Sequence, residues 1–397
     1  MGQERQLNSV VVTVGRSGAD ICGQDGRALQ AAVDYVGNLG GGVVKILPGE
    51  YVMSDSLHLS SGVTVKGSGP DTVLVKSPGV SSPLVLDGDY GEEEITLADP
   101  SGFYPGMGVS IKDDRAVGCW HTTVATITGQ DGNRFAISRP MVLDYLVSSN
   151  ARVDNAFPVI SARDVENVGI ENLRVEGSKD SNVLLSGCRG AGIYLYRADN
   201  VTIRDCIVEN FNGDGISYQK CADVVIENCR IAHNTSFGLH PGSGSQRPII
   251  RGCQVTDNGI IGLFVCWRVK HGCFENNVFS RNGHVGLSIG HKDTDNIIRN
   301  NEISGNGDYG IHFREELEAM AAHRNLVEGN RIYDNGNEQS GYGIRIDSRV
   351  HGVVLRDNII GSDNGDSVQR YAVYKTEAEA QVTLQGNQIW GTCVGVD

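Results

Sequence analysis

Short stretches of alternating apolar and polar residues recur through the second half of the chain, and each begins with a glycine. The phrases read GIYLYR, GISYQK, GLHPGS, GLFVCW, GLSIGH, GIHFRE and GIRIDS, and they begin at Gly192, Gly215, Gly238, Gly262, Gly286, Gly310 and Gly343. The first six glycines are 23 or 24 residues apart, and the last step of 33 residues indicates an inserted loop. Because side chains alternate along a strand, the second and fourth residues are predicted to point inward and the third and fifth outward.

A second set of positions repeats in step with the glycines. An apolar residue follows two places after each of Cys206, Cys229, Cys253, Asn277, Asn301, Asn330, Asn358 and Asn387. Two registers with one period predict a solenoid whose coils have three short strands each and stack in parallel about 4.8 Å apart. Parallel crossovers are almost always right-handed, so the predicted fold is an all-β, right-handed parallel β-helix. The stacked asparagines are predicted to hydrogen-bond along the axis.

The chain divides into three predicted parts. Residues 1–90 contain the first coils and, at residues 27–38, the apolar spacing of an amphipathic helix that ends at a glycine run. Residues 91–157 break the period and contain strand-like runs separated by turns, which predicts a β-rich insertion. Residues 158–397 resume the coils and are expected to carry the functional groove.

Composition and charge narrow the class of protein. The chain has 34 Lys and Arg against 48 Asp and Glu, a net charge of −14, which argues against nucleic acid as a partner. No run of 18 or more apolar residues appears, so no membrane span is predicted. The first residues lack the layout of a signal peptide, so the protein is expected to be either cytoplasmic or secreted with its signal already removed.

The cysteines have a structural interpretation. All 10 lack a CxxC pair and a zinc-type spacing with histidine, so no metal site is predicted. Most fall inside the repeats, which favours buried small apolar side chains over disulfides.

The first coils resemble a known family. Residues 18–69 run from GADICGQDG through a helix and the strand-turn GGVVKILPGEY to VKGSG, an order similar to the start of pectate-lyase-like β-helix proteins. In that family the helix caps the solenoid, and a cap is needed because an open first coil would expose apolar core and strand edges. The resemblance implies action on a carbohydrate polymer or oligosaccharide and allows a monomer or a homo-oligomer such as a trimer. Lyases of this fold often use Ca²⁺; no dense acidic run demands it here, so no cofactor is required and Ca²⁺ is an option.

Residues 236–290 also look similar to the catalytic module of alginate C5-epimerases. In that family an Asp-Pro-His motif follows a glycine-aromatic pair, and the matching positions here are His240, Pro241 and Gly242. The aspartate of the family's next coil corresponds to Cys266. The epimerase motif is therefore not retained, and the resemblance implies a relative that acts on another polymer.

The outward positions of the glycine-led strands are rich in His, Arg, Lys and aromatic residues, unlike an ordinary solvated face. The candidate catalytic residues are His240, His291, His312, Arg314, Glu315, Arg345 and Asp347. The candidate substrate-binding residues are Tyr194, Asp214, Lys220, Trp267, Lys292 and Tyr374. Residues 315–325 have helical composition and are expected to form a loop excursion beside them.

Stacking predicts pairs of these side chains one coil apart. They are His312 with Arg345, Arg314 with Asp347, and His291 with Glu315. A histidine oriented by a carboxylate can act as a general base, and an arginine can stabilise the charge that develops on a uronate. The pairs with carboxylates can equally be surface ion pairs without a function.

Three functions remain open at this point. The first is a polysaccharide lyase, which removes the proton α to a uronate carboxylate and then β-eliminates. The second is a glycoside hydrolase that uses paired carboxylates from among Glu315, Asp347 and Asp214. The third is a non-catalytic carbohydrate binder, such as a tailspike-like solenoid.

Overall fold

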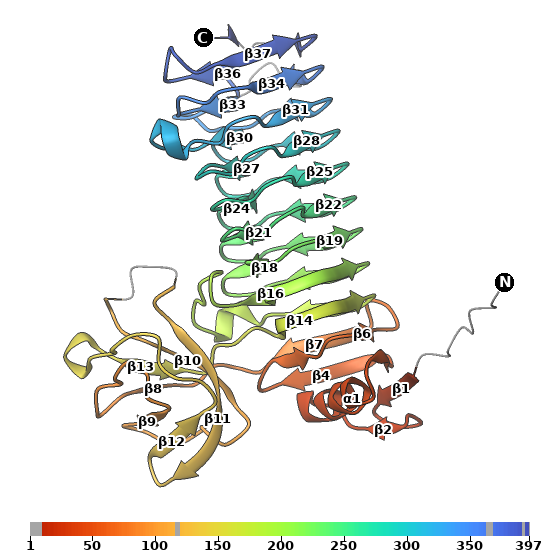
Figure 1. The fold of residues 1–397 in the computed structure, drawn as a ribbon, viewed down its shortest axis with the longest axis vertical. Coiled ribbons are helices and arrows are strands. Elements are labelled where there is room, and N and C mark those ends of the chain that lie inside the picture. The colour runs from red at the N-terminus through yellow and green to blue at the C-terminus, as the bar shows by residue number, and fades with distance from the viewer. Residues whose placement is uncertain (1–9, 116–119, 363–367, 391–393, 397) are drawn as a thin grey trace, which may run out of the picture.

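The computed structural model describes residues 10–115, 120–362, 368–390 and 394–396. It is a tall solenoid with a side module near its lower end (Figure 1). Strands of successive coils pair in parallel, as between β18 (Asp214–Gln219) and β21 (Phe237–Gly242). Each coil contributes to three stacks of strands, which we call first, second and third by their order within the coil. The predicted parallel coils of three strands are confirmed.

The stacks contain the following strands. The first stack contains β5 (Leu57–Leu59), the N-terminal parts of β14 (Ile160–Glu171) and β16 (Ala191–Arg204), β18, β21, β24 (Ile261–Phe264), β27 (Val285–Ile289), β30 (Tyr309–Phe313), β33 (Tyr342–Ile346), β36 (Tyr371–Lys375) and β39 (Val394–Val396). The second contains β1 (Val10–Gly15) with β2 (Ile21–Cys22) beside its end, β3 (Gly42–Ile46), β6 (Val63–Lys66), the C-terminal parts of β14 and β16, β19 (Val224–Glu227), β22 (Ile249–Arg251), β25 (Cys273–Glu275), β28 (Ile297–Arg299), β31 (Leu326–Glu328), β34 (Val353–Arg356) and β37 (Val382–Gln385). The third contains β4 (Gly49–Met53), β7 (Thr72–Lys76), β15 (Arg174–Glu176), β17 (Ile207–Glu209), β20 (Arg230–Ala232), β23 (Gln254–Thr256), β26 (Val278–Ser280), β29 (Glu302–Ser304), β32 (Arg331–Tyr333), β35 (Ile359–Gly361) and β38 (Gln388–Ile389).

The one α-helix in the part of the chain described, α1 (Gly26–Asn38), covers the lower end of the solenoid (Figure 1). The Asp25 carboxylate caps it by accepting a hydrogen bond of 3.2 Å from the backbone N–H of Ala28. Its buried face consists of Leu29, Ala32, Val33 and Val36. These side chains join the apolar core of the coils, so the predicted capping helix is confirmed.

The repeated glycine of each coil is required by close packing between coils. A Cβ atom added to Gly286 would lie 2.8 Å from the carbonyl oxygen of Gly310, and one added to Gly310 would lie 2.6 Å from that of Gly343. The obstructing atoms are backbone atoms, which cannot move away as a flexible side chain could. The glycine period is therefore the period of the stacking itself.

Two ladders of asparagine amides run inside the turns. In the first ladder, Asn277 donates to Asn301 over 3.0 Å, and the chain continues through Asn330, Asn358 and Asn387. Three cysteines precede it in the lower coils, and the N–H of Cys253 donates to Asn277. The predicted hydrogen-bonding along the axis is confirmed for this column.

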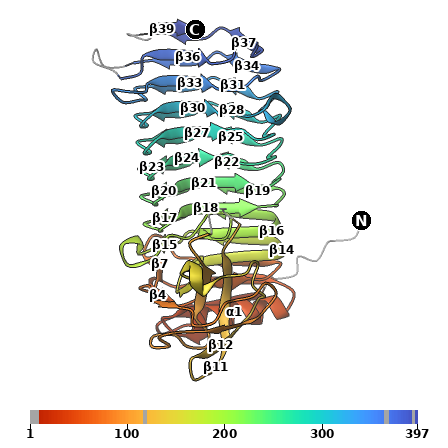
Figure 2. The ribbon, with the colours of Figure 1, turned by 90° about the vertical axis from the view of Figure 1, so that its left-hand side faces the viewer.

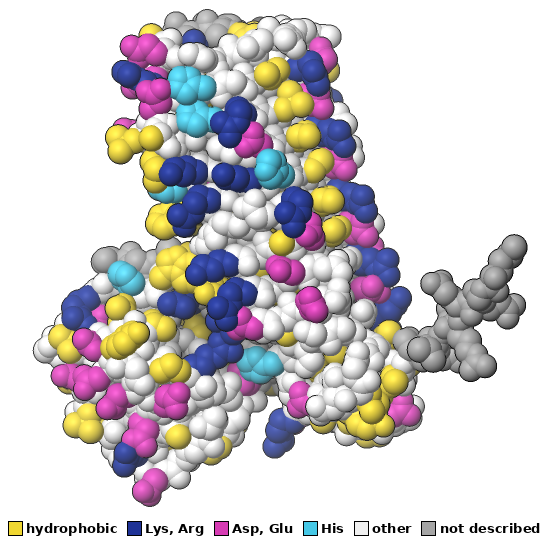
Figure 3. Space-filling model, viewed as in Figure 1, with side chains coloured by type: hydrophobic (Ala, Val, Ile, Leu, Met, Phe, Trp, Pro, Cys, Tyr) yellow, Lys and Arg dark blue, Asp and Glu magenta, His cyan; other side chains and the backbone are white. Residues whose placement is uncertain are grey.

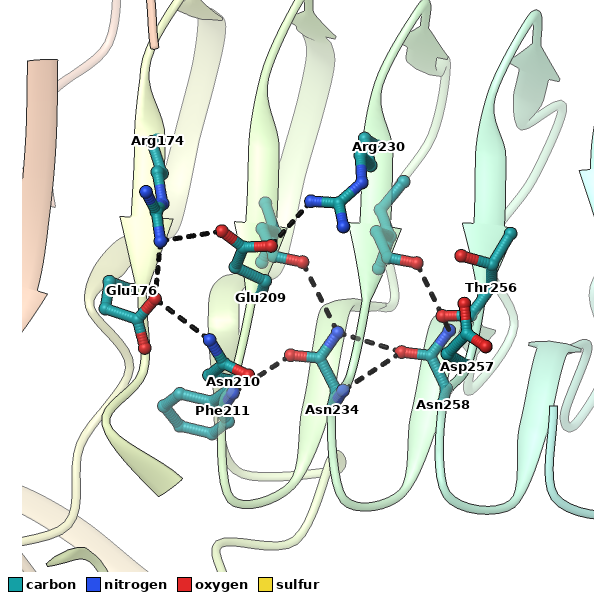
Figure 4. A network of polar contacts seen from close by, with 12 residues as sticks. Arg174, Glu176, Glu209, Asn210, Phe211, Arg230, Asn234, Thr256, Asp257 and Asn258 are labelled. Carbon is teal, nitrogen blue, oxygen red and sulfur yellow. Dashed lines mark hydrogen bonds and ion pairs between the residues drawn. The ribbon is translucent and has the colours of Figure 1, made fainter. Parts of the chain in front are cut away.

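A second ladder escaped the sequence analysis. It joins Asn234, Asn258, Asn282, Asn306 and Asn335 by amide hydrogen bonds of 2.8–3.0 Å. Figure 4 shows its beginning, where the N–H of Phe211 donates to Asn234. On the outer side of the same coils, Glu209 accepts from Arg174 and Arg230, over 2.8 and 2.6 Å (Figure 4).

The side module is an antiparallel sheet inserted between coils. Its strands are β8 (Ser81–Pro83), β9 (Glu94–Thr96), β10 (Gly108–Lys112), β11 (Thr123–Asp131), β12 (Arg134–Ile137) and β13 (Arg152–Asp154), in the order β8-β13-β10-β11-β12-β9. It has its own apolar core around Phe135 and Val153. The sheet begins at Ser81, earlier than the expected residue 91. Strand β8 was not predicted, because its residues, SSP, lack the apolar alternation of a strand. The coils resume at β14, and Figure 2 shows the module in front of the lower first stack.

Cys22, Cys206, Cys221, Cys229, Cys253 and Cys273 are free thiols. Cys188, Cys206, Cys221, Cys229 and Cys253 are buried, Cys266 and Cys273 are partly buried, and Cys22 is exposed. Cys119 and Cys393 lie outside the described residues. Within the described ranges, no helix has the length and apolar character needed to cross a membrane.

Candidate functional site

The outer face of the first stack places the candidate residues in the predicted columns. Ser288 pairs with His312, His312 with Arg345, and Arg345 with Tyr374 in successive coils. Lower in the stack, Tyr194 pairs with Ser217 and Ser217 with His240. Lys, Arg and His side chains gather along the coils above the side module (Figure 3). The register of the columns is therefore as predicted, whereas several side-chain partners differ.

The most organised cluster surrounds Asp347. His312 Nε2 lies 2.9 Å from its Oδ2, and Arg345 Nε lies 2.9 Å from both of its oxygens. Burial alone would raise the pKa of the Asp347 carboxyl, but the hydrogen bonds from His312 and Arg345 outweigh it and hold the pKa below its ordinary value. Asp347 is therefore a carboxylate that can only accept hydrogen bonds.

This geometry fixes the proton on the imidazole of His312. Because Asp347 can only accept, Nε2 carries the hydrogen of the neutral ring, and Nδ1 keeps its lone pair. Arg345 lies against aromatic rings, at 5.2 Å from the centroid of Tyr309 and 5.0 Å from that of Tyr342. Both His312 and Arg345 remain partly exposed. The cluster thus presents a fixed base beside a cation on an accessible face.

The predicted pair of Arg314 and Asp347 is wrong. Their backbones are neighbours, but Arg314 turns toward the preceding coils and donates to Ser288 Oγ over 2.9 Å and to the carbonyl of Val265 over 2.8 Å. The cause is Gly290, since a Cβ there would lie 2.7 Å from the Arg314 guanidinium. The missing side chain opens the space that the arginine fills, over the ring of Phe264.

The predicted pair of His291 and Glu315 is also wrong. The partner of His291 Nδ1 is Glu316, at 3.2 Å, and Glu315 is exposed. The alternation of the strand ends with β30, so Glu315 no longer has an outward strand position. Residues 315–325 form a loop, as expected, and despite their helical composition they contain only a 3₁₀ turn, η3 (Glu318–Met320). Trp267 is 42% exposed and packs against His291 at a tilt of 31°, with ring centroids 5.0 Å apart.

Three candidates in the lower coils are covered. His240 Nδ1 lies 2.7 Å from Asp214 Oδ2, and both residues are buried. The loop before β16 lies over them. It passes so close that a Cβ atom added to Gly187 would lie 2.8 Å from His240 Nδ1. In the same loop, the Cys188 carbonyl accepts a hydrogen bond from the Tyr194 hydroxyl. Burial raises the pKa of Tyr194. An outward strand position does not ensure exposure under such a loop, and the expectation that Asp214, His240 and Tyr194 are presented on the outer face of the first stack is corrected.

The remaining candidates lie at the surface. Lys220 and Lys292 are exposed in turns after β18 and β27. Lys220 lies over the ring of Tyr196, with Nζ 5.6 Å from the centroid. Tyr374 is partly exposed and packs against Tyr342 and Tyr371, at 5.2 Å from each ring centroid. This aromatic group, with Tyr309, was missed because only the outward column was searched.

A family model matches most of the coils. It is described as "Right handed beta helix region" and matches residues 159–316 and 265–397, more than half of the chain. The chain belongs to this family. No curated protein matches the sequence.

Solved structures share the fold of this right-handed β-helix. The A-module of Azotobacter vinelandii mannuronan C-5 epimerase AlgE4 has a TM-score of 0.54 and 15% identity over 97% of each chain. The Dettilon tailspike protein gp208 has a TM-score of 0.56 and 16% identity over 93% of this chain and 58% of the tailspike. ORF18 of Geobacillus virus E2 has a TM-score of 0.55 and 12% identity over 97% of this chain and 62% of that protein.

An acidic cavity opens beside the Asp347 cluster. It has a volume of about 590 Å³, and its lining residues are Glu315, Glu316, Leu317, Glu318, Asp347, Ser348, Arg349 and Glu377. Asp214 belongs to a coil five steps below Asp347, which is about 24 Å at the strand spacing. Asp214 therefore cannot be paired with Asp347 or Glu315 for hydrolysis.

Among the described residues, no group of three or more His, Cys, Asp or Glu is arranged to hold a metal ion.

Asp293 is a buried acid beneath Arg314 that the sequence analysis missed. It accepts from the N–H groups of Val269 and Gly290 over 2.9 and 3.0 Å, and Arg314 Nη2 lies 3.4 Å away. Burial raises the pKa of Asp293 to about 7, against the opposing charge of Arg314. Asp293 was not singled out from the sequence, because an aspartate in a turn is common and does not by itself indicate a buried acid.

This acid should make the stability depend on pH. An unfolded aspartate ionises near about 3.9, so between that pH and about 7 the folded state keeps a proton that the unfolded state has lost. The unfolded state binds fewer protons, so the free energy of unfolding should fall as pH rises, by up to about 4 kcal/mol from this residue. Asp293→Asn should remove that contribution, as measured by urea unfolding at several pH values across the interval.

The matched control for this measurement is Asp295→Asn. A hydrogen bond from Arg324 lowers the pKa of Asp295 to about 2, so its contribution is present above about pH 4 and is lost only in more acid solution. Between pH about 5 and 7 this variant should keep the slope of the wild type. Equal slopes for the wild type and Asp293→Asn would contradict the assignment.

Proposed function

We propose that the protein is a polysaccharide lyase that cleaves a uronate polymer by β-elimination on the outer face of the first stack. The observation that carries the proposal is the cluster of His312, Arg345 and Asp347. Asp347 orients the imidazole so that Nδ1 can take the proton α to the uronate carboxylate. Arg345 lies beside it and can stabilise the charge that develops on that carboxylate.

The reaction balances with groups of the chain and solvent. His312 Nδ1 takes the α proton, and the electron pair of that C–H bond forms the new double bond in the sugar ring. The glycosidic C–O bond at the β carbon breaks, and its oxygen leaves with a proton from solvent or from the protonated imidazole. The exposed ring of Trp267 offers a face on which a neighbouring sugar can stack. The name of mannuronan C-5 epimerase, a protein with this fold, describes chemistry on a uronate polymer.

The test is an assay of acidic and neutral polysaccharides in which two signals are followed together. Ultraviolet absorbance reports the unsaturated product of elimination, and a reducing-end assay reports chain cleavage. We expect both signals to rise with an acidic polymer and neither with a neutral one. Reducing ends without absorbance would contradict elimination. Absence of both signals across the set would favour a non-catalytic carbohydrate binder.

The second candidate is a glycoside hydrolase, which the acidic cavity supports. Glu315 and Asp347 line the same cavity, and hydrolases need two carboxyl groups about 5–9.5 Å apart. Against this, the hydrogen bonds that lower the pKa of Asp347 make it unsuited to act as the general acid, so Glu315 would have that role. Under this alternative, Glu315→Gln should abolish the release of reducing ends. Under the lyase proposal, it should leave the rate of elimination close to that of the wild type, because that mechanism gives Glu315 no role.

A further inference from the structure

A cavity of about 320 Å³ lies where the side module meets the lower coils, far from Asp347. Three arginines from separate parts of the chain line it: Arg139 follows β12, Arg163 is on β14, and Arg189 precedes β16. We call it the arginine pocket. In Figure 3, Lys and Arg side chains crowd the same junction. Its walls also include His58 and Tyr194.

The positive charge in this pocket has little compensation. In the described part of the chain, no carboxylate lies within ion-pair distance of Arg139 or Arg163, and both side chains are partly buried. Asp55, the acid in the pocket wall, is bonded to His58 over 3.2 Å and to Thr126 over 2.6 Å. Asp164, the next residue to Arg163, pairs with Arg197.

The electrostatics agree with this arrangement. Burial, and next the charge of Arg163, lower the pKa of the Arg139 guanidinium. Burial likewise lowers the pKa of Arg163, to which the charge of Arg189 contributes. Desolvated like charges without a carboxylate in ion-pair contact destabilise the free protein, and a bound anion would relieve both effects.

Two of the three arginines, Arg163 and Arg189, are held in place before any ligand arrives. Arg189 donates to the carbonyl of Trp120 from Nε over 3.1 Å and from Nη2 over 2.6 Å, and it stacks over the Trp120 ring. Arg163 lies 4.6 Å from the ring centroid of Tyr196. The guanidinium of Arg163, held by the Tyr196 ring, keeps its N–H fork ready for a planar acceptor, whereas Arg189 offers only the N–H groups that the Trp120 carbonyl does not use.

We propose that the arginine pocket is a binding site for the carboxylate of an acidic sugar unit. A carboxylate matches the arginine fork, and the rings of Tyr196 and Trp120 beside the pocket suit a sugar ring. The volume is near the lower end for small-molecule sites, about 300–1,000 Å³, which fits a short saccharide unit. Arg163 and His312 lie six coils apart, about 29 Å, so a short oligosaccharide in the pocket does not reach His312. The site goes beyond the proposed cleavage and does not depend on it.

Titration calorimetry with the full chain tests this proposal. The probes are trimers of galacturonate, mannuronate and guluronate, their methyl esters, and inorganic sulfate and phosphate. We expect at least one uronate trimer to bind, and we expect its methyl ester to bind at least roughly tenfold more weakly. Arg139→Gln and Arg163→Gln should weaken the binding of the acid trimer by a similar factor, because each removes a charge-assisted hydrogen bond.

Three controls separate the outcomes. Arg134→Gln removes the same charge from an exposed arginine of the side module that pairs with Glu94 and does not line the pocket, and it should leave affinity unchanged. His312→Ala should lose cleavage and keep trimer binding, which distinguishes this site from the catalytic proposal. The pocket variants should melt at the wild-type temperature or higher, because they relieve repulsion between arginines.

The proposal is overturned if wild-type protein binds none of the uronate trimers, or if the pocket variants bind them as tightly as the wild type does. Binding of sulfate or phosphate alone would overturn it as well, since the pocket would then be a site for free inorganic anions.

Discussion

Replacing His312 by alanine is expected to lower kcat for elimination by about 10²–10⁴-fold, the usual contribution of a positioned general base. The imidazole is the base whose proton is fixed by Asp347, and no neighbouring side chain of the described cluster can replace its Nδ1. Asp347→Asn should also lower kcat, because an amide no longer requires the hydrogen to be on Nε2. The rate of increase in ultraviolet absorbance at saturating substrate measures both effects.

His284→Ala is the matched control for this experiment. His284 makes the same kind of contact, with Nδ1 2.7 Å from Asp308, but 60% of its side chain is exposed. Its loss should leave kcat close to the wild-type value, because the proposed mechanism gives His284 no role. A His312→Ala protein that retains the wild-type rate would remove the lyase proposal, provided that its circular dichroism is unchanged.

The second large effect concerns stability. Asn301→Ala should lower the free energy of unfolding by about 3–5 kcal/mol, because the change leaves several buried polar groups without partners. Asn301 Oδ1 accepts from both the N–H and the amide of Asn277, and its own amide donates to Phe274 O and to Asn330. Urea unfolding followed by circular dichroism gives the change.

Gln254→Ala provides the comparison for the ladder variant. Gln254 is exposed on β23 and points away from the core, so its loss should change the free energy of unfolding by less than about 0.5 kcal/mol. If Asn301→Ala were equally mild, the ladder would be a by-product of stacking and would not stabilise the coils.

The sequence predicted the architecture because every coil repeats the same constraints. The glycine period follows from a carbonyl that leaves no space for a Cβ atom, and the asparagine column follows from turns that need an axial partner. Such constraints act between residues of equal phase, so counting residues is sufficient to find them. The second ladder could have been found in the same way, since Asn258, Asn282 and Asn306 are each 24 residues apart.

The site was only partly predictable for a different reason. Register placed His312 beside Arg345, but a long side chain can turn to either neighbouring coil, and the space over Gly290 decided the direction of Arg314. The arginine pocket depends on how the side module folds back on the coils. Arg139 of the side module and Arg163 of the coils line the same pocket, and the period of the repeat does not predict how these two parts pack together.

The amide ladders also divide the chain into interchangeable units. Asn301 and Asn330 are 29 residues apart, whereas Asn277 and Asn301 are 24 apart, yet both steps have the same hydrogen bonds. The additional residues lie in loops, so loops can grow without disturbing the register. Removing residues 277–300 would place Asn301 where Asn277 was and join the coils in phase. The length of the face available to a polymer can therefore change by whole coils, each about 4.8 Å, while the ends of the molecule stay as they are.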